Sequence, residues 1–203
     1  MTQFQHEDLS CIVLPDGTVE IAKYAGPEEP CWPPSTRDVI VPAHIGGRPV
    51  TSIGEEAFRE AHVGRIMLPE TLRRIGRHAF CACHFTQPLV IPDSVEEIGV
   101  HAFYRIGGEV QNPIPASLRH IAPGGYATSG VTGTLVLPET LRFVGSQAFA
   151  WNESLREIVL PACDFQAEEH AFMCVDRLAV HPGSAGEAIA LATSINPHMI
   201  RRL

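Results

Sequence analysis

Hydrophobic residues recur along the chain in three columns that share one spacing. The first column is an aliphatic residue followed by proline, and 23 residues separate its successive members: Leu68, Ile91, Ile114, Leu137 and Leu160. The second is a branched aliphatic residue, usually followed by glycine: Ile53, Ile75, Ile98, Ile121 and Val144. The third is aromatic: Phe58, Phe80, Phe103, Tyr126, Phe149 and Phe172. Three columns on one period predict a solenoid in which each period forms one coil.

Each period contains the signals for one strand and two changes of direction. The apolar run before each proline, such as residues 65–68, predicts a short strand that ends at the proline, which has no N–H to donate. The Ile-Gly step predicts a turn, because glycine tolerates a positive φ. The segment around Ala-Phe is long enough for one helical or 3-10 turn. Successive strands would lie parallel in one narrow sheet, about 4.8 Å apart.

Both flanks of the repeats carry signals for terminal elements. Asp16 and Gly17 stand between two alternating runs, which predicts a tight hairpin. Ser184 is a suitable N-cap and Glu187 follows three residues later, as in a capping box, which predicts a helix over residues 183–193. We therefore expect a single domain over residues 1–203, with a hairpin cap at 9–38, about six repeats at 39–182, and a capping helix with its tail at 183–203.

The repeated unit Ile-x-Leu-Pro-Glu-Thr-Leu-x-x-Ile-Gly-x-x-Ala-Phe resembles the leucine-rich repeat of the BspA-like type, over about residues 39–182. The segments 14–24 and 183–193 are similar to the hairpin and the helix at the two ends of such arrays. The resemblance implies an α/β solenoid, a right-handed superhelix with one narrow parallel sheet. It also implies short helical or 3-10 turns on the convex side.

Two coils depart from the pattern. In the coil at 109–131, Asn112 takes an inward strand position, Pro113 interrupts the strand, and Ala122 replaces the usual glycine. We expect a poorly paired strand or a local bulge there. In the coil after Pro161, Asp164 stands where neighbouring coils have Leu or Val, which predicts a second irregularity.

Strand alternation divides the apolar runs into inward and outward positions. The residues two before each proline of the repeat should face outward: Met67, Val90, Pro113, Val136 and Val159. The neighbouring outward positions hold polar residues: Arg65, Gln111, Thr134 and Glu157. An outward apolar column predicts a surface patch that docks a partner or a second copy of the chain. Two alternatives stay open, since branched residues suit strands in general and a flanking segment can cover the face.

Charged residues form a further column just before the Ile-Gly step. The column contains Arg73 and Arg74, then Glu96 and Glu97, then Arg119 and His120, then Arg142, and the sign alternates over the first three of these coils. This alternation predicts a ladder of salt bridges between coils, in which exposed pairs contribute about 0–1 kcal/mol each. We interpret the ladder as control of register.

Histidine and cysteine provide the candidates for metal binding. His78 and His101 share one repeat position on adjacent coils, and Cys81 and His84 follow within the same turn as His78. Imidazole and thiolate are ligands for zinc and related metals. The alternative is a solvated convex face without a metal, and we keep metal binding only as a remote alternative.

Composition and motifs exclude several classes of function. The chain has 15 basic and 23 acidic residues, a net charge of −8, which disfavours nucleic acids and anionic membranes as partners. No apolar stretch approaches the length of a membrane span, which is about 18 residues. Catalytic motifs and cofactor-binding motifs are missing, so we expect no enzyme activity and no cofactor.

The sequence predicts a non-enzymatic protein–protein interaction module that uses the sheet face, with self-association through that face as one form of binding. An adhesin at the cell surface is the alternative that the resemblance implies. The first ten residues lack the features of a signal peptide, which predicts a cytoplasmic protein. A fragment of a longer surface or secreted protein would have the same features, so that location stays open.

Overall fold

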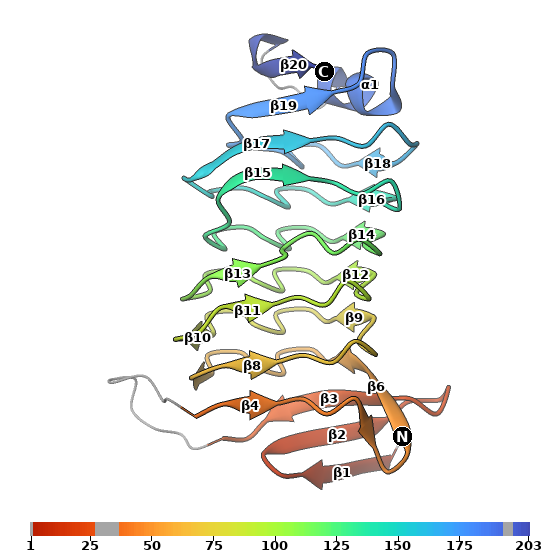
Figure 1. Ribbon diagram of the computed structural model, residues 1–203, viewed down its shortest axis with the longest axis vertical. Coiled ribbons are helices and arrows are strands. Elements are labelled where there is room, and N and C mark those ends of the chain that lie inside the picture. Colours follow the sequence, from red (N-terminus) through yellow and green to blue (C-terminus); the bar gives the residue numbers. More distant parts are fainter. Residues whose placement is uncertain (1, 27–36, 193–196) are drawn as a thin grey trace.

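The chain forms an elongated β-solenoid of about seven turns, with its two termini at opposite ends of the long axis (Figure 1). The computed structural model describes residues 2–26, 37–192 and 197–203. One side of the solenoid carries the strands that precede the prolines, and we call it the Leu-Pro face. Its strands are β4 (Val39–Ile40), β8 (Ile66–Met67), β11 (Leu89–Val90), β13 (Val110–Gln111), β15 (Gly133–Val136), β17 (Leu155–Val159) and β19 (Arg177–Val180).

A second row of strands runs through the Ile-Gly column, and we call it the Ile-Gly sheet. Its parallel strands are β6 (Arg48–Ile53), β9 (Arg74–Ile75), β12 (Glu97–Ile98), β14 (His120–Ile121), β16 (Phe143–Val144) and β18 (Gln166–Ala167). Adjacent strands pair in register across the whole row, as Ile53 with Ile75 and Ile98 with Ile121 show. A third, shorter ladder joins β7 (His62–Val63) to β10 (His84–Phe85).

The Ile-Gly step is therefore a strand, and the prediction of a glycine turn there was wrong. Gly76 and Gly99 do not have positive φ angles. Glycine is needed at both positions because the backbones of adjacent coils approach closely. A Cβ on Gly76 would lie 2.8 Å from the Gly54 carbonyl carbon, and a Cβ on Gly99 would lie 2.6 Å from the Gly76 carbonyl carbon. The second row of strands also means that the coil has more than the one narrow sheet expected.

The left-handed backbone conformation lies two residues beyond this step. Its φ angles are between 50° and 63° at six residues: Glu56, His78, His101, Gly124, Gln147 and His170. The Ala-Phe segments that follow are hydrogen-bonded turns and not 3-10 helices. Among the described residues, the 3-10 helix is η1 (Pro197–Met199). Their backbone also bonds to the next coil, as the 2.7 Å bond from Phe58 N–H to the Ala79 carbonyl shows.

The core lies between the ladders and is organised around the aromatic column. Each of its six rings is at most 1% exposed, and neighbouring rings stack with centroids 5.1–6.4 Å apart. Tyr24 extends the stack, with its ring centroid 5.5 Å from that of Phe58. The aromatic column is thus a continuous buried spine.

Elements of a different kind occupy the two ends. At the N-terminal end β1 (Thr2–His6), β2 (Leu9–Val13) and β3 (Val19–Tyr24) form an antiparallel meander, and β3 pairs in parallel with β6. The turn between β2 and β3 contains Asp16 and Gly17, whose φ is 85°. The strand β5 (His44–Ile45) pairs antiparallel with β6. Residues 27–36 of the segment expected as a hairpin cap lie outside the described residues.

At the C-terminal end α1 (Ala185–Ala192) is followed by β20 (Ile200–Arg202), which pairs with β19. The Glu187 N–H donates to Ser184 Oγ at 3.2 Å, while the Glu187 carboxylate accepts from the Gly183 N–H at 2.7 Å. The first bond is the one that an N-cap serine makes, whereas the second reaches the residue before the N-cap and not the N-cap N–H of the expected capping box. Thr193, the last residue of the expected helix, lies outside the described residues.

The coil at 109–131 has a different register from the one expected. Leu89 pairs with Val110 and Val90 with Gln111, so the strand lies two residues earlier than Pro115 indicates. Asn112 is exposed with a φ of 50°, and the expectation that it points inward was wrong. Within the described part of the chain this strand pairs on one side only, in agreement with the poor pairing expected there.

Candidate functional site

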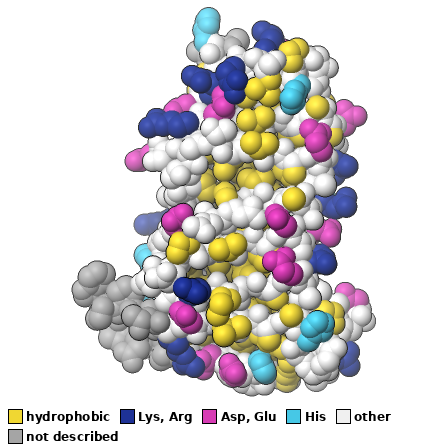
Figure 2. Space-filling model, viewed as in Figure 1, with side chains coloured by type: hydrophobic (Ala, Val, Ile, Leu, Met, Phe, Trp, Pro, Cys, Tyr) yellow, Lys and Arg dark blue, Asp and Glu magenta, His cyan; other side chains and the backbone are white. Residues whose placement is uncertain are grey.

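The Leu-Pro face exposes a line of large aliphatic side chains. The exposed fractions are 60% for Ile40, 36% for Met67, 51% for Val90 and 63% for Val136. Hydrophobic side chains accordingly follow the middle of this face from one end to the other (Figure 2). We call these four residues the apolar column. Three of them are outward residues expected from the sequence.

The apolar column differs from the expected set at three positions. Ile40, which pairs with Met67, was missed because its proline precedes the next one by 27 residues. Pro113 does not belong to the column, since the shifted register puts Gln111 in the outward position beside Val90. The Pro113 carbonyl instead accepts a hydrogen bond from the buried Tyr126 hydroxyl. Val159 faces outward but is half-buried.

The strand ladder on this face is interrupted twice. The paired groups are β4 with β8, β11 with β13, and β15 with β17, β19 and β20. A groove lies at each interruption. The groove between β8 and β11 has a volume of about 390 Å³, and the groove between β13 and β15 about 550 Å³.

The first interruption follows from Pro88. The Leu89 and Ile91 N–H groups donate toward β13, so alternation directs the backbone of residues 88 and 90 toward β8. Pro88 has no N–H to donate there, and the Gly64 carbonyl accepts from Thr86 and Gln87 instead. Met67, Val90, Arg65 and Gln111 are among the residues that line the resulting groove.

The second interruption follows from the shifted strand β13 and from two glycines. Gly130 and Gly133 have φ angles of 71° and 73°, conformations that carry the chain into β15 along a path other coils do not take. Leu135 and Val131 lie at the bottom of this groove and are at most 6% exposed, while Thr134 lies exposed on its wall.

Glu157 of β17 is held by a side chain from β20, two strands further along the ladder. The Arg201 guanidinium donates two hydrogen bonds to its carboxylate, at 2.8 and 2.9 Å. These bonds lower the pKa of Glu157 from its ordinary value. The Glu157 side chain is only 13% exposed, and the Arg201 side chain reaches it from β20.

The charge column forms the expected contacts between coils. Glu96 lies between Arg73 and Arg119, with N–O distances of 3.8 and 3.4 Å, and Arg74 lies 3.7 Å from Glu97. The side chains of all these residues are at least 40% exposed. Because exposed ion pairs contribute little stability, we keep the interpretation that the ladder supports register.

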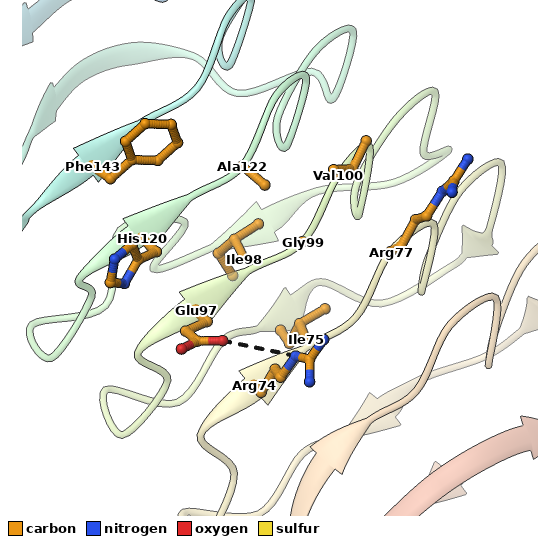
Figure 3. A pocket seen from close by; sticks show the side chains of 10 residues that line it. All are labelled: Arg74, Ile75, Arg77, Glu97, Ile98, Gly99, Val100, His120, Ala122 and Phe143. Carbon is orange, nitrogen blue, oxygen red and sulfur yellow. Dashed lines mark ion pairs between the residues drawn. The ribbon is translucent and has the colours of Figure 1, made fainter. Parts of the chain in front are cut away.

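A hollow of about 370 Å³ lies over the Ile-Gly sheet beside this ladder (Figure 3). Ile75, Ile98 and Ala122 line it, and His120 and Phe143 lie at one end with their ring centroids 6.4 Å apart. Its lining residues include no serine, threonine, cysteine or lysine. The charged and titratable side chains that line it are Arg74, Arg77, Glu97 and His120.

The metal candidates separate into two columns. His78 stacks on His101 with ring centroids 5.3 Å apart, whereas His84 stacks on His62 at 4.9 Å. Burial raises the pKa of the Cys81 thiol, which disfavours the thiolate that binds metals. Among the residues that the structure describes, no group of three or more His, Cys, Asp or Glu side chains is placed to hold a metal ion.

Comparison with known families agrees with the repeat and its geometry. The family model described as "BspA type Leucine rich repeat region" matches six copies over residues 51–179. The chain belongs to the BspA-type leucine-rich repeat family. The matched region of this BspA-type array runs from β6 to β19 and includes the irregular coil at 109–131.

Two solved structures share this BspA-type fold along most of the chain. A leucine-rich repeat protein from T. pallidum has 25% identity and a TM-score of 0.64, over 92% of this chain and 79% of its own. A leucine-rich cell surface protein from Faecalibacterium prausnitzii has 24% identity and a TM-score of 0.69, over 88% of this chain. The chain spans 48% of the length of the F. prausnitzii protein.

No curated protein matches the chain. In the described part of the chain, no helix has the length and hydrophobicity needed to span a bilayer.

Proposed function

We propose that the protein is a non-enzymatic binding module that holds another protein on its Leu-Pro face. The observation that carries the proposal is the apolar column, four large aliphatic side chains exposed in one line beside two grooves. Fully burying one such side chain contributes about 1.5–3 kcal/mol, so a partner that covers the column gains most of its binding energy there. Arg65, Gln111 and Thr134 supply polar contacts at the edges.

The double variant Met67→Glu with Val136→Glu tests this proposal. Both side chains point away from the core, so we expect the variant to fold and to lose its partner, because two carboxylates would have to be buried at the interface. The measurement is affinity capture from the source cells, with light scattering for the oligomeric state. If the variant keeps the same partners and the same oligomeric state as the wild-type protein, the proposal is wrong.

The matched control is Leu191→Glu with Leu203→Glu. These two leucines are also large, hydrophobic and exposed, at 55% and 48%, but they lie at the C-terminal end. The control introduces the same two charges, so it separates a specific effect of the apolar column from a general effect of added charge. We expect it to keep the partners of the wild-type protein.

A location at the cell surface is a second candidate. The F. prausnitzii protein with the same fold is described as a cell surface protein, which favours an adhesin-like role. Labelling of intact source cells with a membrane-impermeant biotin reagent tests this location. The expectation of a cytoplasmic protein stays a prediction, and it is wrong if the protein is labelled.

We also propose that the two ends of the solenoid act as caps. The meander β1–β3 supports this role at one end, where Leu9 and Cys11 of β2 and Ile21 of β3 are buried in the core. At the other end α1 and β20 lie against β19, and Ala190 of the helix is fully buried. Caps of this kind keep end coils from exposing their cores.

A further inference from the structure

The groove between β13 and β15 differs from the rest of the Leu-Pro face, because both of its walls are strands that lack a partner on that side. In the described chain β13 pairs only with β11, and β15 only with β17. Figure 1 shows β13 and β15 further apart than β11 and β13, or than β15 and β17. The groove is thus a gap in an otherwise regular parallel ladder.

The backbone groups on the β15 wall are directed into the groove. The Gly133 and Leu137 N–H groups both donate toward β17, to the carbonyls of Ser154 and Val159 at 2.9 Å. Because the direction of backbone groups alternates along a strand, the N–H groups of Thr134 and Val136 point the other way. They face the groove.

The β13 wall presents an acceptor to the same groove. The Glu109 and Gln111 carbonyls accept from Leu89 and Ile91 of the preceding coil, at 2.9 and 3.2 Å. The Val110 carbonyl between them therefore points toward β15. No strand in the described part of the chain pairs with this carbonyl or with the two opposing N–H groups.

The groove also has an apolar floor and little side-chain bulk. Leu135 and Val131 are 6% and 4% exposed beneath it, and Val110 is half-buried at its side. Gly130 and Gly133 leave open space, with no atom within 4 Å of where a Cβ would lie. Glu109 is the charged residue among those that line it.

We propose that this groove receives an extended peptide segment of the partner, which inserts between β13 and β15 as an added strand. Only an extended chain carries N–H and C=O groups along both of its edges, since a helix satisfies its own backbone internally. Alternate side chains of the peptide would contact Leu135 and the solvent, and Glu109 favours a neutral or basic segment. The proposal deepens the proposed function and rests on it.

The peptide Leu-Arg-Glu-Ile-Val-Leu-Pro, the sequence of residues 155–161, is a suitable probe. It is the strand that this fold already places beside β15 on the opposite edge, with Ile158 next to Leu135. Fluorescence anisotropy of the labelled synthetic peptide measures its binding to the folded wild-type protein. We expect saturable binding, and absence of saturable binding up to the solubility limit of the peptide overturns the proposal.

Two substitutions at Thr134 test the backbone contact. Thr134→Pro removes the N–H that faces the groove, whereas Thr134→Ala removes only the exposed side chain. We expect Thr134→Ala to bind like the wild-type protein and Thr134→Pro to bind about tenfold more weakly, the loss typical of one hydrogen bond. Equal binding by the two variants, with unchanged circular dichroism spectra, contradicts strand insertion.

Hydrogen exchange measured by NMR on the wild-type protein keeps the test independent of any variant that fails to fold. We expect the peptide to slow exchange at the Thr134 and Val136 amides and to leave Leu135 and Leu137 unchanged. Binding without that protection contradicts the proposal. If Met67→Glu with Val136→Glu loses the natural partner while Thr134→Pro keeps it, the face binds the partner but strand insertion is wrong.

Discussion

At the scale of single residues, the coil depends on positions without a side chain as well as on its buried apolar side chains. Gly76 and Gly99 are required because the backbones of adjacent coils leave no room for a Cβ. The same column tolerates Ala122 in the irregular coil. The left-handed conformation at His78 and His101 is one that branched residues rarely adopt. Each of these coils therefore has one position that requires a very small residue and, two residues later, one position in the left-handed conformation.

Gly99→Ala tests the close approach of the coils. The added Cβ would lie 2.6 Å from the Gly76 carbonyl carbon, a backbone atom that moves only if the two coils separate. We expect the free energy of unfolding to fall by about 1–3 kcal/mol, as for overpacking. Urea denaturation measures this, with Ala122→Gly as the control that removes a Cβ from the same column. A smaller loss for Gly99→Ala than for the control would contradict this explanation.

Glu157 provides a prediction about pH. Its pKa is lowered in the folded protein by the hydrogen bonds from Arg201. The pair therefore contributes full stability above the ordinary pKa of 4.5, and this contribution is lost as the pH falls below that value.

We expect Glu157→Gln to lower the free energy of unfolding by about 1 kcal/mol at neutral pH, and the difference from the wild-type protein to shrink on acidification. Urea denaturation at a series of pH values measures it, with Glu70→Gln as the control at an exposed glutamate. A difference that grows as the pH falls would contradict the assigned direction.

At the scale of elements, most strands have only two residues and depend on the next coil for their hydrogen bonds. One missing donor, at Pro88, is then enough to separate β8 from β11. A shift of two residues in β13 separates it from β15 in the same way. The Ile-Gly sheet has no such interruption from β6 to β18. The strand ladder is thus continuous on the Ile-Gly side and interrupted on the Leu-Pro side, although both sides are built from the same repeat.

This difference predicts a pattern of hydrogen exchange in the free protein. We expect amides of the Ile-Gly sheet, such as Gly76 and Gly99, which donate to the preceding coil at 2.8 Å, to exchange slowly. Amides at the two interruptions, such as Thr134 and Val136, should exchange rapidly because no strand among the described residues pairs with them. Exchange measured amide by amide with NMR distinguishes the two sides, and equal protection on both would contradict the interrupted ladder.

At the scale of the whole molecule, the sequence was sufficient for the solenoid and insufficient for its second sheet. The three columns are readable because burial requires apolar residues at the same place in every coil. The role of Gly99 was misread, because a glycine needed for close approach looks the same in sequence as one needed for a turn. The register of the strand that contains Gln111 was also hidden, since Pro115 keeps the regular spacing while the strand lies two residues earlier.

The candidate site was predictable to a similar degree. Met67, Val90 and Val136 follow from strand alternation alone, and all three are exposed. Ile40 stands off the regular spacing, and the shielding of Glu157 depends on Arg201, which is 44 residues away in the sequence. Contacts between the coils and the terminal segments do not recur with the repeat, so the sequence contains no pattern that predicts them. The two grooves and the residues that line them could therefore be identified only from the structure.

The unequal continuity of the two sides has a mechanical consequence. A rod with an unbroken ribbon of hydrogen bonds along one side and breaks along the other bends more easily in one direction. Flexing toward the Ile-Gly sheet widens the breaks, and flexing toward the Leu-Pro face narrows them. A tensile load along the long axis would therefore strain the two sides unequally, because at both breaks the continuous Ile-Gly sheet carries the strand pairing between coils.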